Sequence, residues 1–217
     1  MIKTRQEKTS DSTERIIEAA TVLFARKGFH GVSTRELAAE VGLNIATVNY
    51  HVGGKQALYQ EVFRRTFAKE RELLQALIGE VPDAVVQERE AFRQLLETIV
   101  ESSLNLTREH PEIAQLYVRR WLDQDTTVME NYHEQFSIPL YQMIRDLLER
   151  AQAAGTVDVH GLDLGIFLQS FSWMVYGYFL GEPIDFHQRR RDPFQPENIE
   201  QFKRFLCDYI GRMIKLA

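Results

Sequence analysis

The sequence predicts an all-α protein, with a small N-terminal domain followed by a larger helical one. Apolar residues recur at helical spacing of three and four along most of the 217 residues. Gly42 separates two short segments with helix-capping residues, and the most apolar stretch, residues 162–181, is long enough for a buried helix. About nine helices are expected, divided into a polar arm (1–10), a three-helix domain (11–54) and a second domain (55–217).

The three-helix domain is organised around residues 33–55, STRELAAEVGLNIATVNYHVGGK. Ser33 can accept from the backbone N–H of Glu36, whose side chain can reach back to the cap. Gly42 ends this helix and a second begins near Asn44, which predicts a helix-turn-helix. The second helix of that motif enters the DNA major groove. The predicted base readers are therefore Asn44, Ile45, Ala46, Thr47 and Asn49.

The segments RIIEAATVLFARKGFHGVST and ELAAEVGLNIATVNYHVGGKQAL resemble the N-terminal domain of the tetracycline-repressor (TetR) family over residues 12–60. The resemblance implies double-stranded DNA with a near-palindromic operator as partner. It also implies phosphate contacts by Thr34, Tyr50, His51 and Lys55. Most members have Tyr-x-His-Phe where this chain has Asn49-Tyr50-His51-Val52, so either Asn49 or Tyr50 can be the residue that meets the phosphate.

Further helices follow from the apolar periodicity. The first runs from Asp11 to Lys27, and a long fourth helix from Lys55 joins the two domains. The remaining ones are expected at residues 84–107, 111–122, 128–154, 162–181 and 197–216, with Pro139 kinking the helix that contains it. The helix at 162–181 is apolar all round, and a domain this small cannot wrap it. A homodimer that packs the eighth and ninth helices as a four-helix bundle would cover it.

The charge distribution favours DNA contact at the N-terminal end only. The formal net charge is −5, but residues 1–55 carry eight basic and six acidic side chains, which leaves −7 for the remainder. This positive field is modest, so DNA affinity must depend on local geometry.

Signatures of other protein classes are not found in the sequence. The six histidines include no pair at metal-ligand spacing, and we see no phosphate loop, nucleophile elbow or paired carboxylates, so neither a metal, a cofactor nor an enzyme is predicted. The single cysteine, Cys207, rules out an internal disulfide and is expected to be a small buried residue. The absence of an apolar run of bilayer length and of a signal peptide predicts a cytoplasmic protein without a membrane partner.

An aromatic and methionine-rich set marks a candidate ligand pocket. For any one residue a plain core role is the better interpretation, but the set combines tyrosine hydroxyls with adaptable methionines, which suits a small-molecule site. The resemblance implies a regulatory ligand in this region. The set comprises Tyr117, Trp121, Tyr132, Phe136, Met143, Phe167, Phe171, Met174 and Tyr178.

The predicted function is a homodimeric DNA-binding transcriptional regulator, a repressor that a small-molecule effector releases from its operator. Two alternatives remain at this stage. A protein partner could control a regulator of the same fold, which a closed C-terminal core would favour. An all-helical enzyme or carrier would require a tight acid–base or metal constellation.

Overall fold

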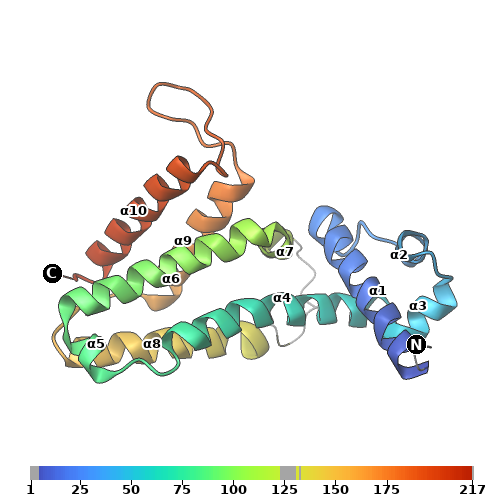
Figure 1. Ribbon diagram of the computed structural model, residues 1–217, viewed down its shortest axis with the longest axis horizontal. Coiled ribbons are helices and arrows are strands. Elements are labelled where there is room, and N and C mark those ends of the chain that lie inside the picture. The colour runs from blue at the N-terminus through green and yellow to red at the C-terminus, as the bar shows by residue number, and fades with distance from the viewer. Residues whose placement is uncertain (1–4, 123–130, 132, 217) are drawn as a thin grey trace. The chain divides into compact units, whose positions relative to one another are not determined.

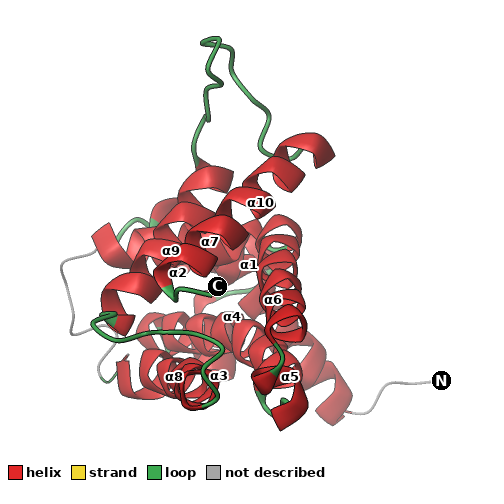
Figure 2. Ribbon diagram, turned by 90° about the vertical axis from the view of Figure 1, so that its left-hand side faces the viewer, coloured by secondary structure: helices red, strands yellow, loops and turns green. Residues whose placement is uncertain are grey.

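The computed structural model describes residues 5–122, 131 and 133–216, without the side chains of residues 5–11 and Phe136. Every regular element in these ranges is a helix, which confirms the all-α prediction (Figure 2). The chain forms two compact units, residues 1–68 with 112–131, and residues 69–111 with 132–217.

The first unit contains α1 (Arg5–Lys27), α2 (Thr34–Val41), α3 (Ile45–Val52), the first part of α4 (Lys55–Ile78) and most of α7 (Pro111–Leu122) (Figure 1). The start of α1 differs from the expected arm over residues 1–10, because the helix already begins at Arg5. The physical reason is local, since residues 5–10 contain neither glycine nor proline to stop a helix.

A chain of aromatic rings forms the core of this unit. Phe24 of α1 meets Tyr59 of α4 edge-on, with ring centroids 4.9 Å apart, and Tyr59 lies 4.8 Å from Phe63. Farther along α4, Phe67 packs against Tyr117 of α7 at 4.5 Å. The first part of α4 and most of α7 therefore belong to the N-terminal unit, whereas the sequence suggested a boundary after residue 54.

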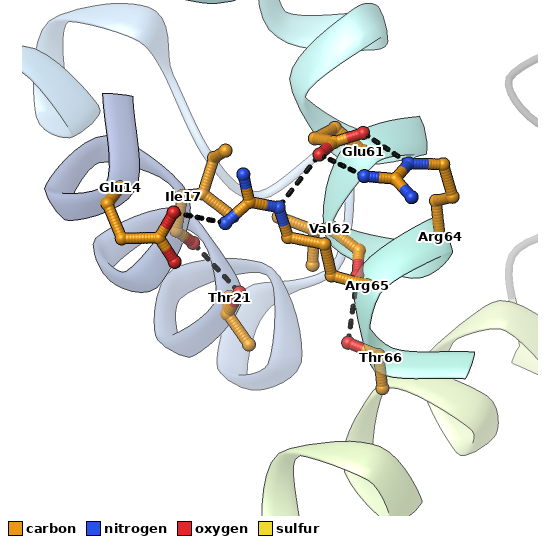
Figure 3. A network of polar contacts seen from close by, with 8 residues as sticks. All are labelled: Glu14, Ile17, Thr21, Glu61, Val62, Arg64, Arg65 and Thr66. Atoms are coloured by element: carbon orange, nitrogen blue, oxygen red, sulfur yellow. Dashed lines mark hydrogen bonds and ion pairs between the residues drawn. The ribbon is translucent and has the colours of Figure 1, made fainter. Parts of the chain in front are cut away.

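An ionic network ties α4 to α1 beside this core (Figure 3). Arg65 donates to Glu14 of α1 and, through Nε at 2.7 Å, to Glu61. Arg64 also donates to Glu61, through Nε and Nη2, each at 2.7 Å. The Arg64 hydrogen bonds, with help from Arg65, lower the pKa of Glu61 to about 2.

The second unit contains the end of α4, α5 (Asp83–Gln87), α6 (Arg89–Glu109), the π-helix η2 (His133–Ser137), α8 (Ile138–Ala153), α9 (Leu164–Leu180) and α10 (Pro196–Met213). α10 packs along α6, and α6 also contacts α9. Both views show the long loop between α9 and α10 standing out from these helices (Figures 1 and 2).

Two of the helices expected from the periodicity have different bounds. The helix expected at 84–107 is interrupted at Glu88, whose extended backbone ends α5 and whose carboxylate caps α6 by accepting from Glu90 and Ala91 N–H. The apolar spacing runs through this break, so it gave no signal. The helix expected at 128–154 begins its α-helical part at Ile138, and Pro139 occupies its first turn, where proline is tolerated. Residues 123–130 and 132 lie outside the described part.

α9 is apolar all round, as expected, but it is not buried all round by this chain. Its inner face includes Phe167 and Val175, which are buried. The outer face leaves Ile166, Trp173 and Leu180 at 67%, 46% and 40% exposure. The residues between Leu164 and Leu180 include no charge. This exposed face is the surface that the sequence assigned to a second copy.

The ionic network should appear in the pH dependence of stability. The pKa of Glu61 is lower in the folded protein than its unfolded value of 4.5. The stabilisation that the Glu61 carboxylate contributes is therefore fully present above pH 4.5 and is lost as the pH falls toward about 2. Glu61→Gln should therefore lower the free energy of unfolding by about 1 kcal/mol at pH 7, a magnitude discounted for partial exposure. Urea unfolding of both proteins at pH 7 and pH 3 measures the difference.

The matched control is Glu72→Gln, an exposed carboxylate on the same helix. It should leave stability at pH 7 within about 0.5 kcal/mol of the wild type. A Glu61→Gln protein that follows the wild-type curve at both pH values would show that the network contributes nothing.

Candidate nucleic-acid interface

α2 begins and ends with local capping interactions. The Ser33 hydroxyl accepts from Glu36 N–H at 3.1 Å, as expected. Gly42 ends the helix at φ 69°, a left-handed conformation that glycine adopts without strain. The second half of the predicted capping box is not formed, because the Glu36 carboxylate accepts from Lys27 of α1 instead. This ion pair lowers the pKa of Glu36 and joins α2 to α1.

α3 is held at its start by Asn44. The Asn44 Oδ1 atom accepts from Thr47 N–H at 2.8 Å and from the Thr47 hydroxyl at 2.9 Å. Gly53 ends the helix at φ 72°. An asparagine that reads adenine must accept through its oxygen and donate through its nitrogen. Because the Asn44 oxygen already accepts twice, its amide nitrogen is the part that remains for a base or phosphate.

The outward face of α3 carries four of the predicted DNA-binding residues. Ile45, Ala46 and Asn49 are exposed, and Tyr50 is 81% exposed. Val48 faces the core of the first unit at 1% exposure. The local fold therefore turns one side of an eight-residue helix toward solvent and fixes it by the other side.

Two further predicted contacts are His51, in the last turn of α3, and Lys55, three residues after it, and both are positioned by neighbouring side chains. His51 Nδ1 lies 3.2 Å from the Thr13 hydroxyl of α1, within hydrogen-bond distance. The Lys55 ammonium lies 4.2 Å from the ring centroid of Phe29, a cation–π contact. Partial burial lowers the pKa of Lys55. Lys55 is also the first residue of α4, where the helix dipole favours an anion over a cation.

Arg35 is a candidate that the sequence analysis missed. It lies next to Thr34 in the first turn of α2 and is exposed. Within the described part of the chain no carboxylate pairs with it, whereas nearby Lys27 pairs with Glu36 and Arg15 donates to the Val41 carbonyl. The sequence offered one signal for Arg35 as a phosphate contact, namely its position directly after Thr34 in the first turn of α2.

The predicted ligand residues are divided between the two units. Tyr117 and Trp121 lie on α7 in the first unit, with ring centroids 5.9 Å apart. The second unit contains Met143 on α8 and four more of the set on α9: Phe167, Phe171, Met174 and Tyr178. Phe167 is buried and stacks on Tyr209 at 6.2 Å. Tyr132 and the Phe136 side chain lie outside the described part, so the common pocket stays a prediction.

A surface groove of about 640 Å³ runs between α6 and α10 in the second unit. Charged side chains that line the groove form ion pairs with one another. Lys203 pairs with Glu200 at 2.9 Å, and Arg212 pairs with Asp208 at 3.0 Å. Cys207 also lines it, and partial burial raises the pKa of that thiol. A raised thiol pKa keeps the less reactive protonated form.

The described residues form neither a metal-binding cluster nor a helix that could span a membrane. They contain no group of three or more histidine, cysteine, aspartate or glutamate side chains that could hold a metal ion. None of the described helices combines the length and the apolar character needed to cross a membrane.

Comparisons with known proteins agree with this local geometry. Residues 16–62, which include α2 and α3, match the family model described as "Bacterial regulatory proteins, tetR family". A curated relative, the probable HTH-type transcriptional regulator YttP of Bacillus subtilis, is 26% identical over 117 residues. That match covers 54% of each chain, so it spans about half the length of the relative.

Solved structures share the fold over nearly the whole chain. AibR, solved in complex with isovaleryl coenzyme A and operator DNA, superposes with a TM-score of 0.69 at 15% identity, over 95% of this chain and all of that one. A putative transcriptional regulator from Saccharomonospora viridis, solved in complex with choline, gives 0.64 at 21% identity, over 94% and 98%. The family match shows that residues 16–62 form a helix-turn-helix domain of the TetR family of bacterial regulatory proteins, and the solved structures share the fold of nearly the whole chain.

Proposed function

We propose that this chain is a DNA-binding transcriptional regulator, and that it acts as a homodimeric repressor released from a near-palindromic operator by a small molecule. The exposed face of α3, fixed at both ends by Asn44 and Gly53, is the observation that carries the proposal. With its side chains an α-helix is about 10–12 Å across, which fits the width of the DNA major groove, about 12 Å. A protein of the same fold, AibR, was solved with operator DNA and an acyl-coenzyme A.

The roles proposed for the interface residues follow from their chemistry and exposure. Phosphate contacts suit hydroxyl, imidazole and cationic donors, and base contacts suit the residues along the outward face of α3. The proposed phosphate ligands are Thr34, Arg35, Tyr50, His51 and Lys55. The proposed base-facing residues are Asn44, Ile45, Ala46, Thr47 and Asn49, with the Asn44 contribution limited to its amide nitrogen.

Dimerisation follows from the reach of α3 and from the apolar surface of the second unit. One recognition helix reads only a few base pairs, so two copies on half-sites about 34–36 Å apart are needed for a specific operator. The exposed apolar side chains of α9 and α10, including Trp173 and Phe205, provide the surface for a second copy.

Release by a ligand requires a link between the pocket and α3. α4 is the proposed link, because its first part belongs to the N-terminal unit and its end belongs to the second unit. In the second unit, Glu70 of α4 accepts from the Tyr176 hydroxyl of α9 at 2.7 Å. In the first unit, the network of Glu14, Arg65 and Glu61 holds α4 to α1. A ligand that binds one arrangement of α4 more tightly would shift the population toward it.

Phosphate contacts should be visible in the salt dependence of DNA binding. Arg35→Ala and Lys55→Ala should each weaken operator and random DNA alike and lower the slope of log K against log salt by about one. Fluorescence anisotropy with labelled duplexes, at salt concentrations from about 50 to about 200 mM, measures both the affinity and the slope. Arg89→Ala is the control, an exposed arginine of the second unit, and it should leave the slope unchanged. Unaltered slopes in both interface variants would rule out this docking.

The two asparagines of α3 should behave differently. Asn49→Ser should alter which operator sequences are selected, because a good base contact is worth about 1–3 kcal/mol of discrimination. Asn44→Ser keeps a capping oxygen and loses only the amide donor, so it should change the selected sequence less than Asn49→Ser does. Selection from a random duplex library followed by sequencing compares them. The assignment would have to be reversed if Asn44→Ser changed the selected sequence and Asn49→Ser did not.

Ligand release predicts reciprocal coupling. A compound that releases the operator should bind more weakly in its presence by the same factor, about 5- to 150-fold for a coupling of 1–3 kcal/mol. Calorimetric titration of that compound into free and operator-bound protein gives both affinities. Phe171→Trp, which enlarges a predicted pocket residue, should reduce the ligand response and leave operator affinity unchanged. Equal ligand affinities in the two titrations would contradict release and favour control by a protein partner.

A further inference from the structure

The outward face of α3 consists of side chains that carry no charge. Ile45, Ala46, Asn49 and Tyr50 are exposed, and at about 100° per residue they cover about 140° of the helix circumference. Val48 lies outside this arc and is buried. Ala46 and Asn49 occupy the middle of the arc, and the small side chain of Ala46 allows the backbone of α3 to come close to the surface that it faces.

The apolar residues of this face stand at the start of the helix. Asn44 caps α3, so Ile45 and Ala46 are the first two residues of its first turn. In a helix-turn-helix the N-terminal residues of the recognition helix contact the base edges. The apolar group that a base edge presents in the major groove is the 5-methyl group of thymine. The position and the chemistry of Ile45 and Ala46 therefore suit thymine.

Neither base of a G·C pair finds its usual reader on α3. Guanine presents two acceptors in the major groove and is read by arginine or lysine, whereas cytosine presents a donor that aspartate or glutamate accepts. Residues 45–52, IATVNYHV, contain none of these four side chains. The Thr47 hydroxyl is not available as a donor, because it already donates to Asn44 Oδ1 at 2.9 Å. The base edges under α3 are therefore not selected by a cation or a carboxylate of that helix.

The cationic side chains nearest to α3 in the chain belong to other helices. Arg35 lies in the first turn of α2. Lys55 begins α4, and its ammonium lies 4.2 Å from the ring centroid of Phe29. Both residues are proposed above as phosphate ligands, which leaves the base edges under α3 to the side chains of α3 itself.

Adenine, the partner of thymine, does have a reader on α3. An asparagine reads adenine bidentately, by accepting from N6 and donating to N7. Asn49 is exposed, and within the described part of the chain its side-chain amide has no hydrogen-bond partner. Asn44 is less suited, because its oxygen already accepts twice from Thr47. Both bases of an A·T pair can therefore be recognised from this one helix face.

We infer, resting on the DNA-binding function proposed above, that the operator presents A·T pairs to α3 and that Ile45 and Ala46 recognise them through thymine 5-methyl groups. Asn49 adds the contact to adenine. Recognition through methyl groups suits the weak positive field of the N-terminal region, because the burial of apolar surface does not depend on charge. Operator affinity is therefore sensitive to the loss of single methyl groups.

Replacement of thymine by uracil tests the inference, because uracil lacks only the methyl group. The operator is first selected from a random duplex library, and its thymines are then replaced one at a time. In each half-site, the replacements opposite Ile45 and Ala46 should each weaken wild-type binding about 4-fold, the value that corresponds to one buried methylene group. Fluorescence anisotropy of the labelled duplexes measures each dissociation constant.

Protein variants assign each methyl group to a side chain. Ile45→Ala should reduce the uracil effect at one thymine to less than about 1.5-fold, and Ala46→Gly should do so at the other, because each variant removes one partner of a coupled pair. Val22→Ala is the matched control, an apolar residue of α1 that is 47% exposed, and it should keep both effects. Circular dichroism verifies that each variant has the helix content of the wild type.

A methyl group added to cytosine gives a positive readout. Cytosine in place of either thymine should weaken wild-type binding, and 5-methylcytosine at the same position should recover about 4-fold of that loss. In Ile45→Ala, 5-methylcytosine should bring no recovery at the position that Ile45 contacts.

The outcomes separate this base preference from DNA binding itself. A chain that selects no sequence over random DNA would overturn the proposed regulator, and the inference with it. Selection of an operator whose all-uracil form binds with unchanged affinity would overturn the inference alone. So would a uracil effect that persists in both α3 variants, since it would then arise from DNA stiffness. Loss of the uracil effect in the matching α3 variant, with retention in Val22→Ala, would support it.

Discussion

Two eight-residue helices are too short to be stable in water by themselves, because a helix of that length does not repay the cost of its first turn. α2 and α3 therefore depend on burial against α1 and the first part of α4. Phe24 and Tyr59 provide the contact that holds these supports together, with both rings almost fully buried. Leu37 and Val48 anchor the two short helices on that core at 1% exposure each. The outward face of α3 can carry small and polar groups only because its inward face is fixed in this way.

The same support explains how a chain with net charge −5 can present a surface for a polyanion. A strongly basic domain would attract DNA at long range, but the excess charge of residues 1–55 is small. Affinity must come from donors at defined positions. The capping of α3 by Asn44 and the packing of Lys55 over Phe29 reduce the freedom of the interface before DNA arrives, so less entropy is lost on binding.

The exposed apolar side of α9 is unfavourable for the second unit when it stands alone. α9 is the most apolar helix, yet one side of it remains in contact with solvent. Exposed apolar area of this kind costs free energy in a monomer and is typical of surfaces that bind another protein. This cost is understandable if the exposed side of α9 packs against another protein surface.

The sequence by itself determined the helix-turn-helix, its match to the TetR family and the all-α class. These depend on local signals: the Ser33 cap, the turns at Gly42 and Gly53, and the apolar spacing, each of which acts over a few residues. Only the tertiary structure decided which partner each polar group takes. Glu36 of α2 bonds Lys27 of α1 instead of its own cap, and Arg65 of α4 bonds Glu14 of α1.

Tertiary contacts also decided where one unit ends and the next begins. Phe67 and Tyr117 are far apart in the chain, and only their packing assigns the first part of α4 and most of α7 to the N-terminal unit. The exposure of one side of α9 belongs to the same class. The reason is physical: capping and periodicity are encoded within a few residues, whereas burial and pairing depend on what distant segments bring to the same place.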